Sequence, residues 1–232
     1  MCIRDRARTV EEALRFKQRG FTTYTVKVGK NVRQDVHNVA AVREALGDDA
    51  SLYVDANGSL NFDDALRLLH ELAPYRIDGA EQPLAHWDLD GAAALAARSP
   101  VALLLDESIG STHDLFGATQ RRAATGVQTK TAKNGGAWHI RQLWTLASAA
   151  GWRIRPGNHP STSLATLSVA HLATAWGGPL LEGPFAGGID GELAGDVVTQ
   201  PVRLQGNRLA LDDRPGWGVE LDPDALERWR IA

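Results

Sequence analysis

The chain has 232 residues, of which 44% are hydrophobic, so it is long enough for one sizeable core and has the length of a single α/β barrel. Its formal net charge of −3 and its dispersed charged residues exclude a strongly basic surface, so nucleic acid is not an expected partner. No apolar stretch is long enough to cross a bilayer and no secretory signal is recognisable, so we expect a cytoplasmic protein without a membrane partner.

The first six residues, Met-Cys-Ile-Arg-Asp-Arg, are interpreted separately. Back-translated as ATG TGT ATA AGA GAC AG, they match a transposon end used in sequencing libraries, so we expect residues 1–6 to be read-through from an adapter. The alternative is a genuine start. If the adapter origin is correct, Met1 and Cys2 are not native, the remaining chain has no Cys for disulfide or thiol chemistry, and native coding continues upstream.

From Thr9 onward, strand-like and helix-like segments alternate. Thr9, with Glu12 three residues later, has the capping-box pattern of a helix start. Short β-branched or apolar runs bounded by turn residues predict seven strands, over residues 22–28, 52–55, 77–81, 101–106, 127–130, 152–155 and 179–182. Apolar residues at helical spacing predict helices over residues 9–20, 32–46, 62–69, 89–98, 112–124, 140–147 and 161–175.

This alternation predicts a parallel sheet that closes on itself. Strand–helix–strand connections are almost always right-handed, and seven such units cannot stay flat for long. A closed barrel of this kind has eight strands, and the helix that starts at Thr9 has no strand before it. We therefore predict a TIM-like barrel that is truncated at its N-terminus, with its first strand missing.

Five charged residues end five of the predicted strands. Asp55, Glu81 and Asp106 end three successive ones, and Lys27 and Lys130 end the strands on either side. In a parallel barrel these strand ends meet at one rim, where catalytic groups gather. Three carboxylates there would form an oxygen cage for a hard divalent cation such as Mg²⁺, and two flanking lysines could move protons.

Each of these residues also has a structural explanation. A strand-end Asp such as Asp55 is often a turn former, and a strand-end Lys can lie along apolar surface with its ammonium in water. Five such residues in register are hard to explain in this way. Two other functions stay open: a metal-dependent barrel hydrolase, although no His ends a strand beside the carboxylates, and a non-catalytic fragment or scaffold.

A family resemblance joins these residues into one set of motifs. The chain from about Thr9 to its end resembles the enolase superfamily, in the muconate lactonizing enzyme subgroup. The motifs are Val26-Lys27-Val28-Gly29, Asp55-Ala56-Asn57, Glu81-Gln82-Pro83, Asp106-Glu107-Ser108 and Lys130-Thr131-Ala132-Lys133-Asn134-Gly135-Gly136.

The resemblance implies a (β/α)7β barrel with Mg²⁺, or Mn²⁺ as the alternative, held by Asp55, Glu81 and Asp106. It implies an acid/base pair at Lys27 and Lys130, because a Lys base beside a metal-stabilised ene-diolate is known chemistry of this superfamily. The implied activity is that of a metal-dependent isomerase or lyase. It removes a proton α to the carboxylate of a small substrate through an enolate, with a cycloisomerase or a racemase/epimerase outcome.

The sequence departs from the family pattern in two places. The family has Lys-x-Lys on its second strand, whereas this chain has Thr25-Val26-Lys27, so Lys27 lacks a neighbouring cation that would lower its pKa. The last predicted strand lacks the Asp-x-Asp of dipeptide epimerases, which argues against a dipeptide substrate. Lys133 is the less favoured base, because Lys130 occupies the sixth-strand position of the lactonizing enzymes.

Further residues are expected to support this site. Asn57 and Glu107 would orient the ligands or the bases. The polar loop over residues 157–163 precedes a helix, so Asn158 and His159 are expected to contact substrate, although His159 has an alternative explanation as an exposed loop residue. Glu182, at the end of the last predicted strand, belongs to the same group.

The chain divides into residues 7–201, the barrel domain, and residues 202–232, which resemble the segment that returns to the family's N-terminal capping domain. That capping domain is not in this sequence. Trp217, Leu221 and Trp229 would then face a missing surface, and we expect the 232-residue chain to be poorly active. Oligomers are common in the family, but nothing in the sequence fixes a homo-oligomeric state.

Overall fold

The structure is a computed structural model that describes residues 6–181 and 193–230. Its sheet consists of β1 (Thr23–Lys27), β2 (Ser51–Asp55), β3 (Gly79–Glu81), β4 (Leu103–Leu105), β5 (Gly126–Lys130) and β6 (Arg153–Gly157). The helices are α1 (Arg6–Gln18), α2 (Val32–Leu46), α3 (Phe62–Leu72), α4 (Leu89–Ala96), α5 (Thr112–Arg121), α6 (Thr131–Asn134), α7 (Ala137–Ala149), α8 (Ser163–Trp176) and α9 (Pro223–Arg228), with a 3₁₀ turn at Ala73–Tyr75.

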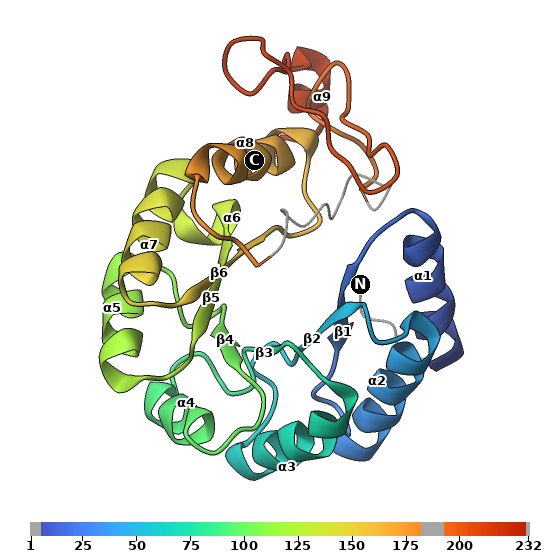
Figure 1. The fold of residues 1–232 in the computed structure, drawn as a ribbon. Helices are drawn as coiled ribbons and strands as arrows, with labels where there is room; N and C mark the ends of the chain where they lie inside the picture. Colours follow the sequence, from blue (N-terminus) through green and yellow to red (C-terminus); the bar gives the residue numbers. More distant parts are fainter. Residues whose placement is uncertain (1–5, 182–192, 231–232) are drawn as a thin grey trace.

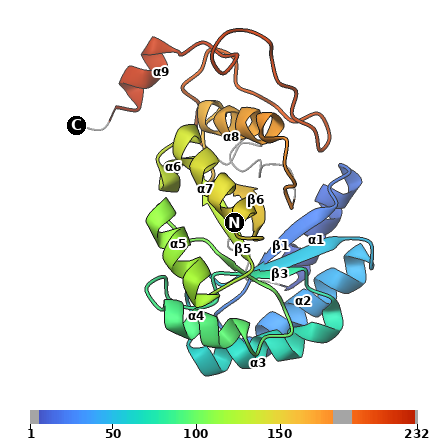
Figure 2. The same cartoon turned by 60° about the vertical axis from the view of Figure 1, so that its left-hand side comes forward.

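The six strands are parallel, and each pairs with the next along the chain, so the sheet order is β1-β2-β3-β4-β5-β6. The sheet curls into an arc with the longer helices on its convex side (Figures 1 and 2). This arrangement follows from right-handed strand–helix–strand connections, which place the connecting helices on the same face of the sheet.

The predicted strand over residues 179–182 differs from the structure. Residues 179–181 form no strand, and Glu182 lies outside the described residues. The Leu181 N–H donates to the Ile154 carbonyl at 2.9 Å, so the chain still runs beside β6. Pro179 has no N–H to donate to a ladder. The described sheet therefore has six strands rather than the seven predicted.

Short polar side chains begin most of the outer helices. Asn31, Asn61, Asp88 and Ser111 each accept a hydrogen bond from a backbone N–H in the first turn of α2, α3, α4 and α5 respectively. The predicted N-cap at Thr9 is wrong, because α1 already begins at Arg6 and Thr9 lies inside it.

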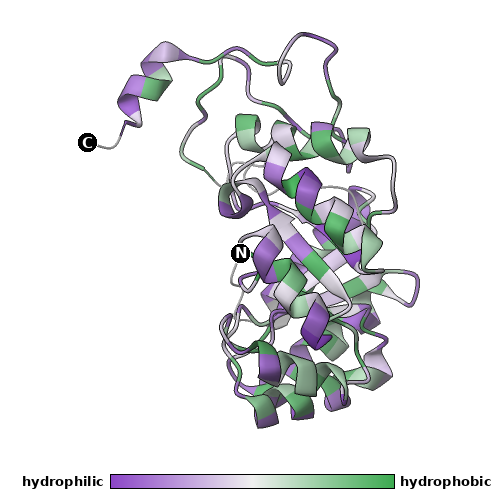
Figure 3. Ribbon diagram, turned by 90° about the vertical axis from the view of Figure 1, so that its left-hand side faces the viewer, coloured by the Kyte–Doolittle hydropathy of each residue, from purple (hydrophilic) through white to green (hydrophobic). Residues whose placement is uncertain are grey.

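The two faces of each strand have different roles. On β1, Tyr24 and Val26 are buried and belong to the main apolar cluster, while Thr25 and Lys27 point to the other face. The outer helices complete the core with one apolar side: on α3, Ala65, Leu68, Leu69 and Leu72 are buried. Figure 3 shows apolar and polar residues on these same helices. The inner face of the curled sheet is thereby left for polar groups.

The tail after residue 192 joins the two ends of the arc. Asp196 accepts hydrogen bonds from Ser163 at the start of α8, at 2.9 Å from the backbone N–H and 2.6 Å from the hydroxyl. Further on, Asn207 donates to the Gly20 carbonyl after α1 at 2.6 Å. Trp217 lies against His171 of α8, with ring centroids 5.6 Å apart.

The other two aromatic or apolar tail residues singled out in the sequence are about half exposed, Leu221 at 48% and Trp229 at 49%. Among the described helices, none is both long and apolar enough to cross a membrane.

A buried tryptophan fixes the packing of α7 on the sheet. Trp144 is fully buried, and its indole N–H donates to the hydroxyl of Thr129 on β5 at 2.8 Å. Its ring meets Trp176 of α8 edge to face, with centroids 5.5 Å apart. The indole hydrogen bond thus ties α7 to β5, and the ring contact joins α7 to α8.

We predict that Thr129→Val destabilises the protein by about 1–3 kcal/mol, because it leaves the Trp144 N–H buried without an acceptor at nearly constant volume. The control is Thr145→Val on α7, next to Trp144, where an exposed hydroxyl donates to the Arg141 carbonyl, and its effect should stay within about 0.5 kcal/mol. Urea unfolding of both variants measures the difference. Equal losses would show that the indole hydrogen bond does not stabilise α7.

Candidate active site

The strand register places the predicted site residues along one rim. Lys27, Asp55 and Glu81 are paired partners at the ends of β1, β2 and β3. Asp106 directly follows β4, and Lys130 ends β5. Parallel strands present their carboxyl ends at the same edge of a sheet, so the structure brings all five residues to the inner rim of the arc.

Lys27 begins a chain of polar contacts across this rim. Its ammonium forms an ion pair with Asp55 and donates to the Asn57 side-chain carbonyl at 2.7 Å. Asn57 in turn donates from its side-chain amide to Glu107 at 3.0 Å, and its backbone N–H donates to Asp55 at 2.9 Å. Asn57 therefore connects the first lysine with the loop that follows β4.

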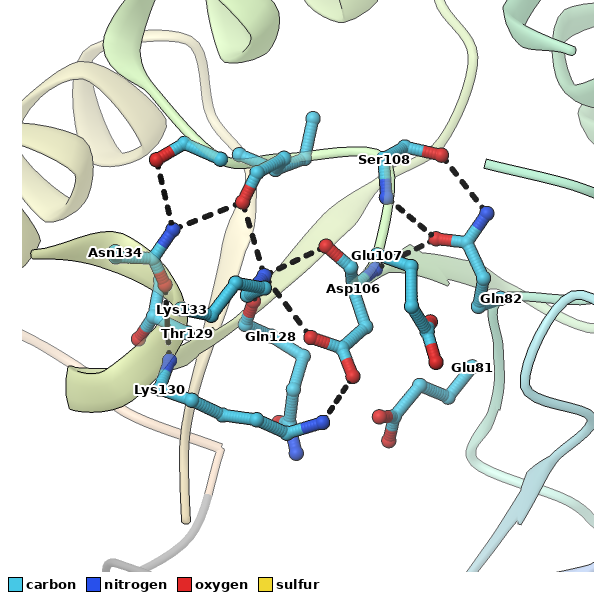
Figure 4. Close-up of polar contacts among 12 residues, drawn as sticks. Glu81, Gln82, Asp106, Glu107, Ser108, Gln128, Thr129, Lys130, Lys133 and Asn134 are labelled. Atoms are coloured by element: carbon cyan, nitrogen blue, oxygen red, sulfur yellow. Dashed lines mark hydrogen bonds and ion pairs between the residues drawn. The ribbon is translucent and has the colours of Figure 1, made fainter. Parts of the chain in front are cut away.

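Asp106 is fully buried and has two lysine partners (Figure 4). Lys130 forms an ion pair with one carboxylate oxygen, and the Lys133 ammonium lies 2.9 Å from the other. Burial by itself would raise the pKa of Asp106, but Lys133 and then Lys130 outweigh it and hold that pKa below its ordinary value. Asp106 is therefore ionised, and the two lysine ammonium groups compensate its negative charge.

The two lysines differ in protonation behaviour. Burial would lower the pKa of Lys130, but its ion pair with Asp106 outweighs burial and raises it. At Lys133 burial dominates and lowers the pKa. The Lys133 ammonium donates to three backbone carbonyls, those of Asp106 at 2.6 Å, Ile109 at 2.9 Å and Gln128 at 3.1 Å. Lys133 thus binds the loop that follows β4 to the end of β5, whereas Lys130 stays protonated at the rim.

Glu81 is the third carboxylate, and its partner was not predicted from the sequence. Arg155 of β6 is buried and donates to Glu81 across a distance of 2.9 Å. Burial, then the charges of Asp55 and Asp106, raise the pKa of Glu81 well above its ordinary value, although Arg155 and Lys130 act in the opposite direction. Glu81 therefore lies close enough to both other carboxylates to feel their charge.

These carboxylates fit a divalent cation in their chemistry. All three offer only oxygen, the donor that Mg²⁺ prefers, and the charges of Asp55 and Asp106 contribute, after burial, to the raised pKa of Glu81, so the three carboxylates are close neighbours. Within the ranges that the structure describes, however, no group of three or more His, Cys, Asp or Glu side chains is arranged to hold a metal ion. Each carboxylate is instead paired with a basic side chain.

Gln82 is a second residue that sequence reasoning missed. It is buried, adopts a left-handed φ of 37°, and its side-chain carbonyl accepts from the backbone N–H groups of Asp106 at 2.9 Å and Ser108 at 3.1 Å. Its amide donates to the Ser108 hydroxyl at 2.8 Å (Figure 4). Gln82 thereby holds the chain at Asp106. The available signal was a polar residue directly after a strand-end Glu.

The loop after β6 contains the remaining predicted residues. Asn158 is buried, donates to Thr166 of α8 at 2.9 Å and accepts from the Ser161 hydroxyl at 3.1 Å, so its amide binds its own loop to α8. His159 is exposed overall, but partial burial of its ring, and then the charge of Lys130, lower its pKa. Glu182, the last of the five supporting residues predicted from the sequence, lies outside the described residues.

Comparison with known proteins identifies the family. The profile of the family described as "Enolase C-terminal domain-like" matches residues 8–225. The chain belongs to this family. Muconate cycloisomerase 1 of Pseudomonas putida is 32% identical over 97% of the chain, and N-succinyl-L-Arg/Lys racemase of Bacillus cereus is 31% identical over all of it. The chain spans 60% and 62% of the length of these two relatives.

The solved structures agree with this assignment to the muconate lactonizing enzyme subgroup of the enolase superfamily. The crystal structure of muconate cycloisomerase from Pseudomonas fluorescens superposes with a TM-score of 0.89 at 30% identity, covering 98% of this chain and 63% of the other. The prediction of a TIM-like α/β barrel of this superfamily is confirmed. Both a cycloisomerase and a racemase are relatives, so the match does not select one outcome.

We predict that Asp106→Asn destabilises the metal-free protein by about 3–5 kcal/mol near pH 7, because it removes the ion-pair partner of the buried Lys130 and the partly buried Lys133. The pKa of Asp106 is lowered by folding, so its contribution is present above the unfolded carboxyl pKa of about 3.9 and is lost as the pH falls through the folded pKa. The difference between variant and parent should therefore shrink in acid. Urea unfolding in EDTA across this pH range measures it.

The matched control is Asp90→Asn, which removes an ion pair between Arg121 and an Asp90 side chain that is 88% exposed. Its effect should be within about 0.5 kcal/mol at every pH. If Asp106→Asn matched this control, the buried ion pairs would not stabilise the fold.

Proposed function

We propose that this chain is the barrel part of an isomerase or lyase that removes the proton α to the carboxylate of a small substrate. The observation that carries the proposal is the order of charges along the rim. Lys27 and Lys130 lie at the two ends of a row formed by Asp55, Glu81 and Asp106, and the two lysines come from strands on either side of the acidic ones. A substrate above the row would meet one ammonium group from each flank.

The two lysines are proposed to act as a proton donor and a proton acceptor. In the structure Lys130 holds its proton, because Asp106 raises its pKa, so it is set to deliver a proton rather than remove one. It becomes a base once its ion pair with Asp106 is weakened. Asn57, which binds the Lys27 ammonium, would keep that side chain directed along the rim.

Asp55, Glu81 and Asp106 are the residues that would hold Mg²⁺, or Mn²⁺ in its place. When bound, the cation would stabilise the negative charge that develops on the substrate carboxylate as an enolate forms. The support from this chain is its oxygen-only donor set and the closeness of the three carboxylates, since the charges of Asp55 and Asp106 add to burial in raising the pKa of Glu81.

The names of the relatives suggest which carboxylates to test, and they include muconate cycloisomerases, a racemase for N-succinyl-Arg/Lys and an epimerase for L-Ala-D/L-Glu. The proposal covers both cycloisomerisation and racemisation or epimerisation. A cytoplasmic location and a homo-oligomeric state stay predictions from the sequence. A metal-dependent hydrolase is less well supported, because no His lies among the contacts of the three carboxylates described above.

We predict that Lys130→Ala slows α-proton exchange by at least about 10²-fold, because a general acid/base group is removed. The measurement is deuterium incorporation from D₂O, followed by NMR with Mg²⁺, into N-succinyl amino acids and muconolactone. Long incubations suit a chain expected to be poorly active. The double variant Lys27→Ala/Lys130→Ala should show no exchange above the uncatalysed rate.

Lys17→Ala serves as the control, because Lys17 lies on the outer helix α1 and donates to the Leu46 carbonyl, away from the rim. It should exchange at the parent rate. Exchange that persists unchanged in the double variant would exclude both lysines from the proton transfer.

A further inference from the structure

Resting on the proposed function, we propose that Arg155 is a positioning residue for Glu81: it holds this carboxylate in the orientation that receives a divalent cation. The proposal adds a residue from the far edge of the sheet to the site.

Arg155 reaches its partners from the last strand of the described sheet. It lies on β6, whereas Glu81 is on β3 and Thr25 is on β1, the opposite edge. Its side chain donates to Glu81 at 2.9 Å and to the Thr25 hydroxyl at 2.7 Å. The guanidinium also lies over the ring of Tyr53 on β2, 4.3 Å from the centroid. One side chain thus connects four strands across the hollow of the arc.

These contacts fix the guanidinium rather than leave it for substrate. Arg155 is 4% exposed, and Tyr53 beneath it is 3% exposed. A planar guanidinium that stacks on a ring and donates to two partners has little freedom to turn. Arg155 therefore acts through Glu81 and is not itself a catalytic residue.

The contact with Glu81 is of the kind that orients a metal ligand. It involves the carboxylate oxygen Oε2, and among the contacts of the described residues none is made to the second oxygen, Oε1. Glu81 ends β3, between Asp55 at the end of β2 and Asp106 directly after β4, so the orientation of its carboxylate decides whether one oxygen from each residue can share a cation. Hydrogen bonds that orient a ligand typically affect metal affinity by about 10–100-fold.

Arg155 could also have the opposite effect on metal affinity. Its positive charge would repel a cation and compete with it for Glu81. Loss of Arg155 would then tighten metal binding, whereas loss of a positioning residue weakens it. The two effects differ in sign, so a binding measurement separates them.

The experiment is calorimetric titration of the 232-residue chain with Mg²⁺, repeated with Mn²⁺ followed by electron paramagnetic resonance. Arg155→Met should weaken both affinities by about 10–100-fold, and Arg155→Lys, which keeps the charge but not the fork, by less than about tenfold. Thr25→Val removes only the second anchor of the guanidinium and should weaken binding a few-fold.

The matched control is Arg43→Met. Arg43 is another buried arginine and lies on the outer helix α2. It donates to backbone carbonyls, including those of Tyr75 and Ala50, and contacts none of the site residues named above. It should lower stability and leave the metal affinity unchanged. If Arg155→Met is too unstable to titrate, the smaller change Thr25→Val carries the test.

Unchanged or tighter binding by Arg155→Met, or by Thr25→Val where that variant carries the test, would overturn the positioning role. Asp106→Asn separates this failure from failure of the proposed function. If Asp106→Asn abolishes binding while Arg155→Met does not weaken it, only the role of Arg155 is wrong. If the unchanged chain binds neither ion saturably, or Asp106→Asn binds as well as the parent, the metal site is wrong and the role of Arg155 falls with it.

Discussion

Three carboxylates lie buried along one rim of the sheet, and the site depends on how their charge is compensated. Asp55, Glu81 and Asp106 are each at most 3% exposed. An uncompensated buried carboxylate is strongly unfavourable, so each is paired with a basic side chain from another strand or loop. These ion pairs hold the ends of the strands together and also place the amines beside the acids.

The same pairing links stability with chemistry. Lys130 keeps its proton because Asp106 needs a counter-ion, so the group proposed to move a proton is also a structural partner of a proposed metal ligand. Lys133 is more fully committed to structure, since three carbonyls accept from its ammonium. Gln82 adds a neutral support by fixing the backbone at Asp106. The site is thus a network in which few side chains could change independently.

Arg155 shows how the curvature of the sheet contributes. A flat six-stranded sheet would keep β6 far from β1, but the arc brings their inner faces close enough for one guanidinium to contact Thr25 and Glu81. The tail adds a second connection between the ends of the arc, through Asp196 at α8 and Asn207 at Gly20. The order of the strands alone does not predict either connection.

The sequence by itself determined the alternation of strands and helices, the family, and the location of Lys27, Asp55, Glu81, Asp106 and Lys130 at strand ends, because strand period and length are local properties. The sequence-based prediction placed the start of α1 three residues too late and gave residues 179–181 as a strand, which they do not form. Contacts with neighbouring segments decide the conformation at both places. Only the tertiary structure decided which base pairs with which acid, the direction of the Lys130 pKa shift and the role of Arg155. Those depend on distances between residues far apart in the chain, which spacing along a sequence does not specify.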